Sequence, residues 1–412
     1  MQYGLIGEHL GHSYSVPIHR LITGEDYELR EIAPEDLGAF MTRKEFRAIN
    51  VTIPYKQDVI PYLDEISDTA REIGAVNTIV NRDGHLYGTN TDAAGLQALI
   101  IRVCPDIRGR KTLVLGTGGT SKTAVYTAKA MGADPVIRVS RSARDGAVTY
   151  EEALRDHRDA EILINTTPCG MFPAAEDMPV NIDGFPELRG VVDVIYNPLR
   201  TKLVLAAMRR GIPAEGGLYM LAAQAVRAAE VFRGIRYAEG LTERIDRRMA
   251  RDKENIVLTG MPGSGKSAVS SILGARTGRE VIDTDRMIVE KAGMEITEIF
   301  RRYGEKHFRD LESEVIREAA ARAGVIISTG GGAVLREENV DALRRNGRLV
   351  WLDRKPEDLV PTDDRPLADS REKMAALHAA REPIYRATAD ERIAVTGSAE
   401  DTADETESRW NA

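Results

Sequence analysis

The chain has few of the residues that secreted and membrane-spanning proteins depend on. Only two cysteines, Cys104 and Cys169, occur among 412 residues, so no disulfide framework is implied and a reducing compartment is indicated. No apolar run approaches the length that crosses a bilayer, and residues 1–11 do not have the basic start and long apolar stretch of a secretory signal. We therefore expect a soluble, cytoplasmic protein with no membrane partner.

An excess of positive charge is also missing. The chain has 56 Lys and Arg against 64 Asp and Glu, a formal net charge of −8. Nucleic-acid-binding surfaces are usually strongly basic, so this balance argues against a nucleic-acid partner. The length suggests about two to three domains. The oligomeric state is left open by the sequence.

Short apolar runs alternate with helical patterns along most of the chain. Strands are predicted at 3–6, 112–115, 162–165 and 255–259, and a strongly amphipathic helix is predicted over 218–232. Strands separated by helices favour parallel pairing through βαβ units. The fold class is therefore α/β with parallel sheets.

A first glycine-rich loop follows the predicted strand 112–115. It contains Gly116, Gly118 and Gly119, and helix-compatible residues come after it. A loop between a strand and a helix is the geometry of a dinucleotide site, although the pattern here is G-x-G-G-x-S. Taken alone, the loop is weak evidence for such a site.

A second glycine-rich loop fills every position of the pattern G-x-x-x-x-G-K-[ST]. Its glycines allow backbone N–H groups to face phosphate oxygens, its lysine reaches the β- and γ-phosphates, and its serine can hold Mg²⁺. The residues concerned are Gly260, Gly263, Ser264, Gly265, Lys266 and Ser267. Two different nucleotide loops in one chain indicate two enzymes joined end to end.

Polar segments in the first half gather at the ends of predicted elements. They are HSYS (12–15), NVTIPYK (50–56), AVNT (75–78), GTNTD (88–92) and GLYMLAAQ (217–224). Each alone reads as a cap, a turn or a solvated loop. Together they resemble the shikimate dehydrogenase family over residues 1–245.

This resemblance implies a substrate-binding domain over 1–99 and 217–245 and a Rossmann NADP-binding domain over 100–216. Ser13 and Ser15 would donate to a substrate carboxylate, and Lys56 with Asp92 would form the catalytic pair. The ring hydroxyls and the cleft would be contacted by Thr52, Asn77, Tyr196 and Gln224, and Gly217 would lie beside the cofactor.

The second strand of the nucleotide unit ends in VSRS (139–142). An NAD enzyme needs an acidic residue there for the ribose hydroxyls, whereas Arg141 would attract a 2′-phosphate. Ser140 precedes it where the family usually has asparagine. The cofactor is therefore expected to be NADP(H), although an arginine on a solvated turn would look the same.

The second half carries five segments in a characteristic order after the phosphate loop. They are DTD (283–285), GEKHFR (304–309), STGGG (328–332), RPL (365–367) and REPIY (381–385). In this combination they resemble the shikimate kinase family over residues 254–396. The resemblance implies ATP as phosphoryl donor and a small polyhydroxylated carboxylic acid as acceptor.

The kinase resemblance also implies roles for individual residues. Arg309 and Arg381 would clamp the acceptor carboxylate, because guanidinium presents a planar fork. Asp285 would orient the attacking hydroxyl, and Asp283 with Ser267 would hold Mg²⁺. Arg365 would be a lid arginine over the phosphate, Lys266 would offset phosphate charge, and the ring would lie against Gly330, Gly331 and Gly332.

The expected protein is a bifunctional shikimate-pathway enzyme. It would reduce 3-dehydroshikimate to shikimate with NADPH and phosphorylate shikimate with MgATP. A charged linker is predicted at 246–254, a P-loop kinase domain at 255–396 and a disordered tail at 397–412. The alternatives are a quinate and NAD preference in the first half, or a non-catalytic regulator that senses these ligands.

Overall fold

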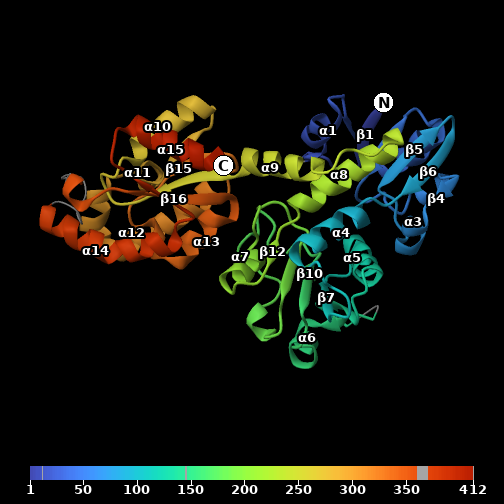
Figure 1. Cartoon of the computed structure of the whole chain (residues 1–412), viewed down its shortest axis with the longest axis horizontal. Coiled ribbons are helices and arrows are strands. Elements are labelled where there is room, and N and C mark those ends of the chain that lie inside the picture. The colour runs from blue at the N-terminus through green and yellow to red at the C-terminus, as the bar shows by residue number, and fades with distance from the viewer. Residues whose placement is uncertain (12, 144–145, 360–369, 412) are drawn as a thin grey trace. The chain divides into compact units, whose positions relative to one another are not determined.

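The computed structural model describes the whole chain except residues 12, 144–145, 360–369 and 412 (Figure 1). The chain folds as two compact units, residues 1–250 and 251–412. Each unit has its own sheets and its own hydrophobic cores. None of the helices in the described ranges is long and apolar enough to cross a membrane.

The first sheet of unit 1 is mixed. Strand β1 pairs in parallel with β2 and β3, whereas β5 is antiparallel to both β3 and β6. Ile6, Ile49 and Ile79 face one core, while Leu5 and Val80 face another. The strand order is β2 (Glu28–Glu31), β1 (Tyr3–Gly7), β3 (Ala48–Val51), β5 (Thr78–Arg82), β6 (His85–Thr89) and β4 (Glu65–Ile66).

The second sheet of unit 1 is entirely parallel, which confirms the predicted doubly wound arrangement. In β7, Leu113 and Leu115 pack toward one core and Val114 toward another, because alternate side chains of a strand point to opposite faces. The strand order is β12 (Ala214–Glu215), β11 (Gly190–Asp193), β10 (Ile162–Asn165), β7 (Thr112–Leu115), β8 (Val136–Ser140) and β9 (Val148–Thr149).

The helices of unit 1 cover both sheets. Helices α4 and α8 pack against each other, and α4 also contacts α5 and β11. Their bounds are α1 (Ser15–Thr23), α2 (Leu37–Arg43), α3 (Asp68–Ile73), α4 (Asp92–Val103), α5 (Gly119–Ala130), α6 (Tyr150–Asp156), α7 (Lys202–Arg209) and α8 (Leu218–Arg233). Short 3₁₀ helices occur at Pro34–Asp36, Ile60–Tyr62 and Ile182–Gly184.

The predicted charged linker at 246–254 is not an extended segment. Helix α9 (Leu241–Lys253) runs through it, and strand β13 begins at Asn255. Ile245 and Met249 are buried in a core of unit 1, since their spacing of four places them on one face of the helix. The segment is charged, as the sequence indicated, but it is helical.

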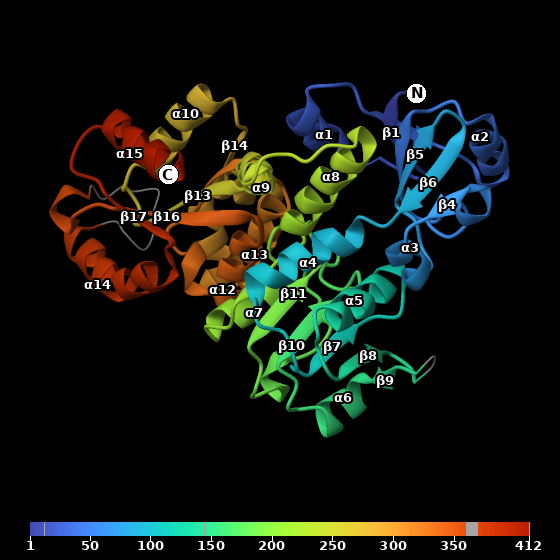
Figure 2. The same cartoon turned by 45° about the vertical axis from the view of Figure 1, so that its right-hand side comes forward.

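Unit 2 is built on a five-stranded parallel sheet with helices on both faces (Figure 2). Val257 and Trp351 face one core, while Ile256 and Leu258 face the other. The strand order is β14 (Val281–Asp283), β15 (Ile326–Ser328), β13 (Asn255–Thr259), β16 (Gly347–Asp353) and β17 (Glu391–Ala394). The helices are α10 (Lys266–Thr277), α11 (Thr284–Ala292), α12 (Ile296–Ala320), α13 (Glu337–Asn346), α14 (Arg371–Thr388) and α15 (Ala399–Asn411), with 3₁₀ helices at Ala333–Leu335 and Pro356–Asp358.

The prediction of a disordered tail at 397–412 is wrong. Helix α15 covers most of this range and packs against α10. Ala403 and Trp410 are buried in a core, and the Trp410 ring lies below the guanidinium groups of Arg279 and Arg348. The prediction failed because most residues of this segment are acidic or small. Its few apolar residues lie at helical spacing on one face, and that face is stable only when the rest of the unit covers it.

Two candidate active sites

The predicted catalytic pair of unit 1 is an ion pair. Lys56 follows β3, and its Nζ donates to Oδ2 of Asp92 at 2.6 Å. Asp92 is the first residue of α4, where the partial positive charge of the helix N-terminus favours a carboxylate. Both side chains are partly exposed, at 28% and 17%. The arrangement presents an ammonium donor in a fixed position at the surface of the site.

A buried network orients the amide of Asn77. Its Oδ1 accepts from Thr91 N at 2.7 Å, from Thr91 Oγ1 at 3.2 Å and from Thr78 Oγ1 at 2.9 Å. Asn50 Nδ2 donates in turn to Thr78 Oγ1 at 3.0 Å. Three donors on the amide oxygen fix the orientation of the Asn77 side chain. The sequence did not identify Asn50, Thr78 and Thr91, since short polar residues beside strands look like ordinary caps.

An aromatic contact joins the two lobes of unit 1. Tyr196 follows β11 of the second sheet, and its ring meets that of Tyr14 edge-on at 5.5 Å. Tyr14 lies between Ser13 and Ser15, and Ser13 Oγ accepts from the backbone N–H of Ser15 at 3.2 Å. The predicted carboxylate-binding serines and Tyr196 are thus brought together.

Gln224 lies on α8 where this helix packs closely against α4. A side chain at Gly95 of α4 would lie 2.6 Å from the Met220 carbonyl oxygen and 2.8 Å from Gln224 Cβ. Gln224 Nε2 donates to Leu221 O at 3.0 Å, which orients its amide. Thr52 is fixed from the other side, since its N–H donates to Ile6 O at 2.9 Å.

The loops after β10 and β11 are joined by a buried carboxylate. Asp193 Oδ1 accepts from Asn165 Nδ2 and from Ile195 N, each at 3.0 Å, and its Oδ2 accepts from Thr201 Oγ1 at 2.7 Å. Burial raises the pKa of Asp193 to about 6, although these donors oppose the shift. Asp193 therefore fixes the backbone that carries Tyr196.

The first glycine loop is shaped for close approach. Gly116 has φ 110°, and a side chain there would lie 2.8 Å from Thr166 Oγ1. Ser121 Oγ closes the loop by donating to Gly116 O at 2.7 Å. A side chain at Gly118 or Gly119 would meet nothing within 4 Å, so open space lies beside the N-terminus of α5. Such a helix end suits a diphosphate.

The other predicted cofactor residues of unit 1, which are Ser140, Arg141 and Gly217, differ in their exposure to solvent. Ser140 ends β8, its Oγ donates to Ser142 O at 2.5 Å, and Arg141 follows it as an exposed side chain. Gly217 precedes α8, and its N–H donates to Ile195 O at 2.8 Å. A side chain at Gly217 would overlap the Val194 carbonyl, so close packing alone already requires this glycine.

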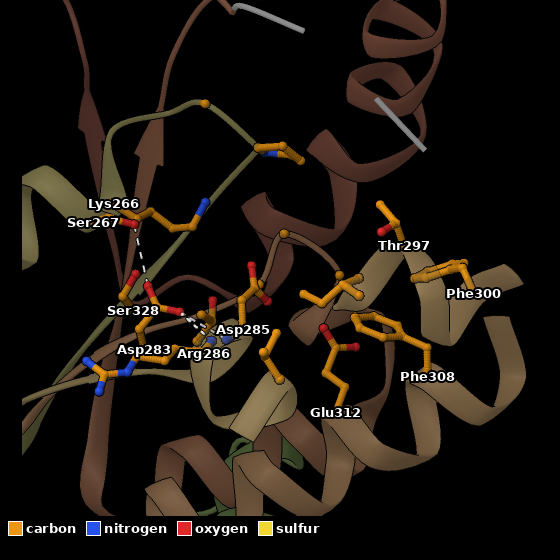
Figure 3. Close-up of a pocket in the computed structure, with 18 of the residues that line it drawn as sticks. Lys266, Ser267, Asp283, Asp285, Arg286, Thr297, Phe300, Phe308, Glu312 and Ser328 are labelled. Atoms are coloured by element: carbon orange, nitrogen blue, oxygen red, sulfur yellow. Dashed lines mark hydrogen bonds between the residues drawn. The ribbon is translucent and has the colours of Figure 1, made fainter. Parts of the chain in front are cut away.

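The phosphate loop of unit 2 precedes α10 (Figure 3). Gly260, Gly263 and Gly265 have φ of 143°, 78° and 101°, which glycine adopts without strain. Lys266 Nζ donates to Gly260 O and Met261 O, each at 2.9 Å, and Ser264 is buried under the loop. The turn and its lysine are therefore preformed.

Ser267 and Asp283 meet at the mouth of this loop. Ser267 Oγ donates to Asp283 Oδ2 at 3.5 Å, while Asp283 Oδ1 accepts from the N–H groups of Asp285 and Arg286. Within the described part of the chain, no group of three His, Cys, Asp or Glu residues could hold a metal ion. A hydroxyl and one carboxylate are enough for Mg²⁺ when phosphates and water complete its shell.

A cavity of about 840 Å³ opens beside the phosphate loop. Its walls bring together residues from the loop, α11, α12, α14 and the segment after β15. The predicted residues that line it are Gly263, Gly265, Lys266, Ser267, Asp283, Asp285, Arg309, Gly330, Gly331, Gly332 and Arg381. Arg365 lies outside the described residues.

Thr297, Phe300, Phe308 and Glu312 also line this cavity, and the sequence did not identify them. Phe300 and Phe308 pack against each other, with ring centroids 4.7 Å apart. Glu312 follows Arg309 by three positions, so both lie on one face of the helix. A charged residue between apolar neighbours on a buried helix face was the available signal.

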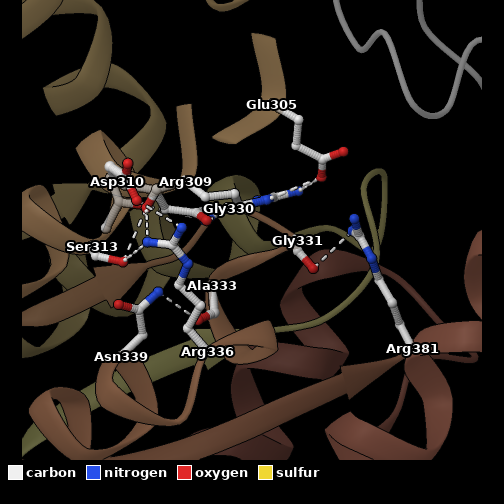
Figure 4. A network of polar contacts seen from close by, with 12 residues as sticks. Glu305, Arg309, Asp310, Ser313, Gly330, Gly331, Ala333, Arg336, Asn339 and Arg381 are labelled. Carbon is white, nitrogen blue, oxygen red and sulfur yellow. Dashed lines mark hydrogen bonds and ion pairs between the residues drawn. The ribbon is translucent and has the colours of Figure 1, made fainter. Parts of the chain in front are cut away.

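The charges around the cavity are held in place by buried contacts (Figure 4). Arg309 Nη1 donates to Glu312 at 2.7 Å, and Arg381 Nη1 donates to Gly331 O at 2.9 Å. Burial raises the pKa of Glu312, opposed by Arg309, and burial lowers the pKa of Arg381. A side chain at Gly332 would overlap the Arg309 guanidinium, so this glycine is needed for the approach.

Together these features define the class of the protein. Unit 1 combines a doubly wound sheet, a dinucleotide-type loop and a lysine–aspartate ion pair, features that dehydrogenases use. Unit 2 combines a phosphate loop with an acidic and arginine-lined cavity, as P-loop kinases of small acids do. The chain is a dehydrogenase fused to a kinase.

Comparisons with known families identify both parts. The family model for the shikimate dehydrogenase substrate binding domain matches residues 5–79, and that for shikimate kinase matches residues 262–409. The NADP(+) shikimate dehydrogenase of Clostridium beijerinckii is 38% identical over 258 residues, which cover 58% of this chain and 95% of the relative. That of Geobacillus kaustophilus is 35% identical, covering 56% and 92%. The chain belongs to the shikimate dehydrogenase family and carries a shikimate kinase domain, which makes it a bifunctional shikimate-pathway enzyme.

Solved structures give the same result for unit 1. A chorismate mutase/shikimate 5-dehydrogenase fusion protein from Clostridium acetobutylicum is 33% identical with a TM-score of 0.57, covering 60% of this chain and 96% of its own. A shikimate 5-dehydrogenase from Thermus thermophilus, in complex with NADP(H) and shikimate, is 28% identical with a TM-score of 0.54, covering 60% and 99%. A quinate dehydrogenase from Corynebacterium glutamicum, in complex with NAD, is 26% identical with a TM-score of 0.54, covering 60% and 98%.

Proposed function

We propose that unit 1 reduces 3-dehydroshikimate to shikimate with NADPH, and that unit 2 transfers the γ-phosphoryl group of ATP to shikimate. The observation that carries the proposal is the cavity of unit 2, where two arginines suited to a carboxylate lie beside a phosphate loop. Such a cavity accepts the acid that the family of unit 1 produces. The product of one site is then the acceptor of the other.

In the reduction, bound NADPH supplies a hydride to the ketone carbon. Lys56 donates a proton to the oxygen as negative charge develops there, and Asp92 keeps the ammonium in position through their 2.6 Å contact. Ser13 and Ser15 bind the carboxylate, while Thr52, Asn77 and Gln224 contact ring hydroxyls. Tyr196 closes the site from the second lobe. The substrate-binding lobe is proposed to comprise 1–99 and 217–245, and the NADP lobe 100–216.

NADP is the proposed cofactor of unit 1. The relatives at 38% and 35% identity carry NADP(+) in their names. Arg141 follows β8 as an exposed cation, where a 2′-phosphate would be attracted. The similar quinate dehydrogenase was solved with NAD, so the ratio of activity with NADPH and NADH is the measurement that separates the two readings.

In the phosphoryl transfer, MgATP supplies the phosphoryl group. Asp285 accepts the proton of the attacking hydroxyl, and Arg309 with Arg381 holds the carboxylate so that this hydroxyl faces the phosphate loop. Lys266 offsets the phosphate charge, and Ser267 with Asp283 binds Mg²⁺ directly or through water. Arg365 is proposed to cover the transferring phosphate.

One preparation of the whole chain tests both reactions. Given 3-dehydroshikimate, NADPH, ATP and Mg²⁺, it should oxidise NADPH and form shikimate 3-phosphate in sequence. Omitting ATP should stop the reaction at shikimate, and supplying shikimate alone should bypass NADPH. Ligand binding without turnover at either site would instead identify that unit as a non-catalytic sensor.

A further inference from the structure

The carboxylate-binding edge of Arg309 already holds a carboxylate of the protein. Glu305 Oε1 accepts from Arg309 Nε at 3.3 Å and from Nη2 at 3.2 Å (Figure 4). Nε and one Nη form the side of a guanidinium that binds a carboxylate through two parallel hydrogen bonds. Glu312 occupies the remaining Nη1. The two carboxylates therefore contact all three nitrogens of Arg309, and Glu305 contacts both nitrogens of the Nε/Nη2 edge.

The two carboxylates on Arg309 differ in how easily they can leave. The Glu312 side chain is 1% exposed and bonds at 2.7 Å, so releasing it would strand a buried charge. The Glu305 side chain is 53% exposed and its bonds are longer. Only the carboxylate of this pair reaches water, since the Arg309 side chain is 10% exposed, and water can replace the contact that Glu305 loses. Of the two carboxylates, Glu305 is thus the less firmly held. Glu305 is the group that an incoming anion displaces.

The backbone beside Glu305 supports such a movement. Helix α12 is interrupted at Gly304, which has φ 80° and ψ 173°, and Glu305 is the first residue after the break. The Glu305 side chain thus begins next to this break and is 53% exposed, so solvent is available to it when it leaves Arg309.

We propose that Glu305 is a built-in competitor for the substrate carboxylate. It occupies Arg309 while the acceptor site is empty and is exchanged for the carboxylate of the acid when this acid binds. The exchange keeps one carboxylate on the Nε/Nη2 edge of Arg309, so the guanidinium is never left to attract phosphate groups of the nucleotide. This inference rests on the proposed kinase function of the same cavity.

The test compares Glu305→Gln with the whole wild-type chain. Glutamine keeps the size of the side chain but lacks the charge, so it competes less. In the kinase reaction, the KM for shikimate should fall about three-fold, which corresponds to the loss of one weak ion pair. The kcat of this reaction should stay near the wild-type value. The KM for shikimate methyl ester, which lacks the charged carboxylate, should not change.

Glu314→Gln is the matched control. Glu314 lies on the same helix and pairs with Lys291 at 2.8 Å instead of with Arg309, so both KM values should stay at the wild-type level. An unchanged or raised shikimate KM in Glu305→Gln would overturn the competition, as would an equal fall for acid and ester. If the wild-type chain did not phosphorylate shikimate at all, the proposed kinase function would fail instead, and the two failures are distinguishable.

Discussion

The two sites are proposed to bind the same acid by different chemistry. Around the Lys56–Asp92 pair of unit 1, the other proposed contacts are neutral hydroxyls and amides, held by buried hydrogen bonds. The cavity of unit 2 is instead lined by Arg309, Arg381 and several carboxylates. With Lys56 as the single cation among these groups, it is the one proposed proton donor of unit 1. In unit 2 the transferring phosphate is itself highly charged, so fixed cations and anions must be balanced around it.

The largest expected effect concerns the single cation of unit 1. Lys56→Ala should lower ketone reduction about 10²- to 10⁴-fold, because a positioned proton donor is worth that much. Shikimate phosphorylation by the same preparation should stay at the wild-type level. Steady-state rates of both reactions measure this. Reduction above about a tenth of wild type would show that another group donates the proton.

Arg381→Lys tests the guanidinium side of the comparison. Lysine keeps the charge but cannot present a planar fork, so the shikimate KM of the kinase should rise about ten-fold or more, as loss of a charged hydrogen bond predicts. Reduction of 3-dehydroshikimate should not change. A normal shikimate KM would remove Arg381 from the proposed clamp and leave Arg309 to bind the carboxylate alone.

Arg141→Asp tests whether unit 1 uses a second cation to bind its cofactor, apart from Lys56 at the proposed reacting ketone. Replacing attraction with repulsion at the ribose should raise the KM for NADPH and shift the preference toward NADH by about ten-fold. Dehydrogenase kinetics with the two cofactors measure the ratio, and the kinase reaction serves as the internal control. An unaltered ratio would mean that another residue contacts the 2′-phosphate.

Asp193→Asn tests the buried carboxylate of unit 1. Because the folded pKa of about 6 lies above the unfolded value of 3.8, this carboxyl favours the folded state most below pH 4, and that contribution is lost as pH rises through 6. The wild type should therefore lose stability relative to Asp193→Asn as the pH rises from about 4 to 6, by at most about 3 kcal/mol. Denaturant unfolding of unit 1 at several pH values measures it. A stability difference that does not depend on pH would mean that burial does not raise the pKa of Asp193.

The smallest effect is expected on separating the sites. Chains 1–250 and 251–412 should each fold and keep their own activity, since each unit has its own cores and all of its proposed catalytic residues. The lag before shikimate 3-phosphate appears should be similar for the intact chain and for an equimolar mixture. An insoluble half, or a lag that vanishes only in the intact chain, would contradict this independence.

The sequence predicted more of the sites than of the segments around them. Glycine loops and short polar motifs carry fixed spacing, so the residues from Gly260 to Ser267 could be assigned before any contact was known. The helix within 397–412 could not be predicted in this way. Burial of Trp410 stabilises that helix only when the sheet of unit 2 is there to pack against. For 246–254 the sequence likewise indicated a charged linker but not that helix α9 continues to Lys253.

What the sequence by itself determined is the pairing of two nucleotide loops and two families in one chain. Those features are local, since each depends on residues a few positions apart. Only the tertiary structure decided how Asn77 is oriented, that Glu312 is buried against Arg309, and that Glu305 contacts the Nε/Nη2 edge of this arginine. The orientation of Asn77 depends on residues distant along the chain. The two carboxylates on Arg309 are close in sequence, but their burial depends on how the helix is covered.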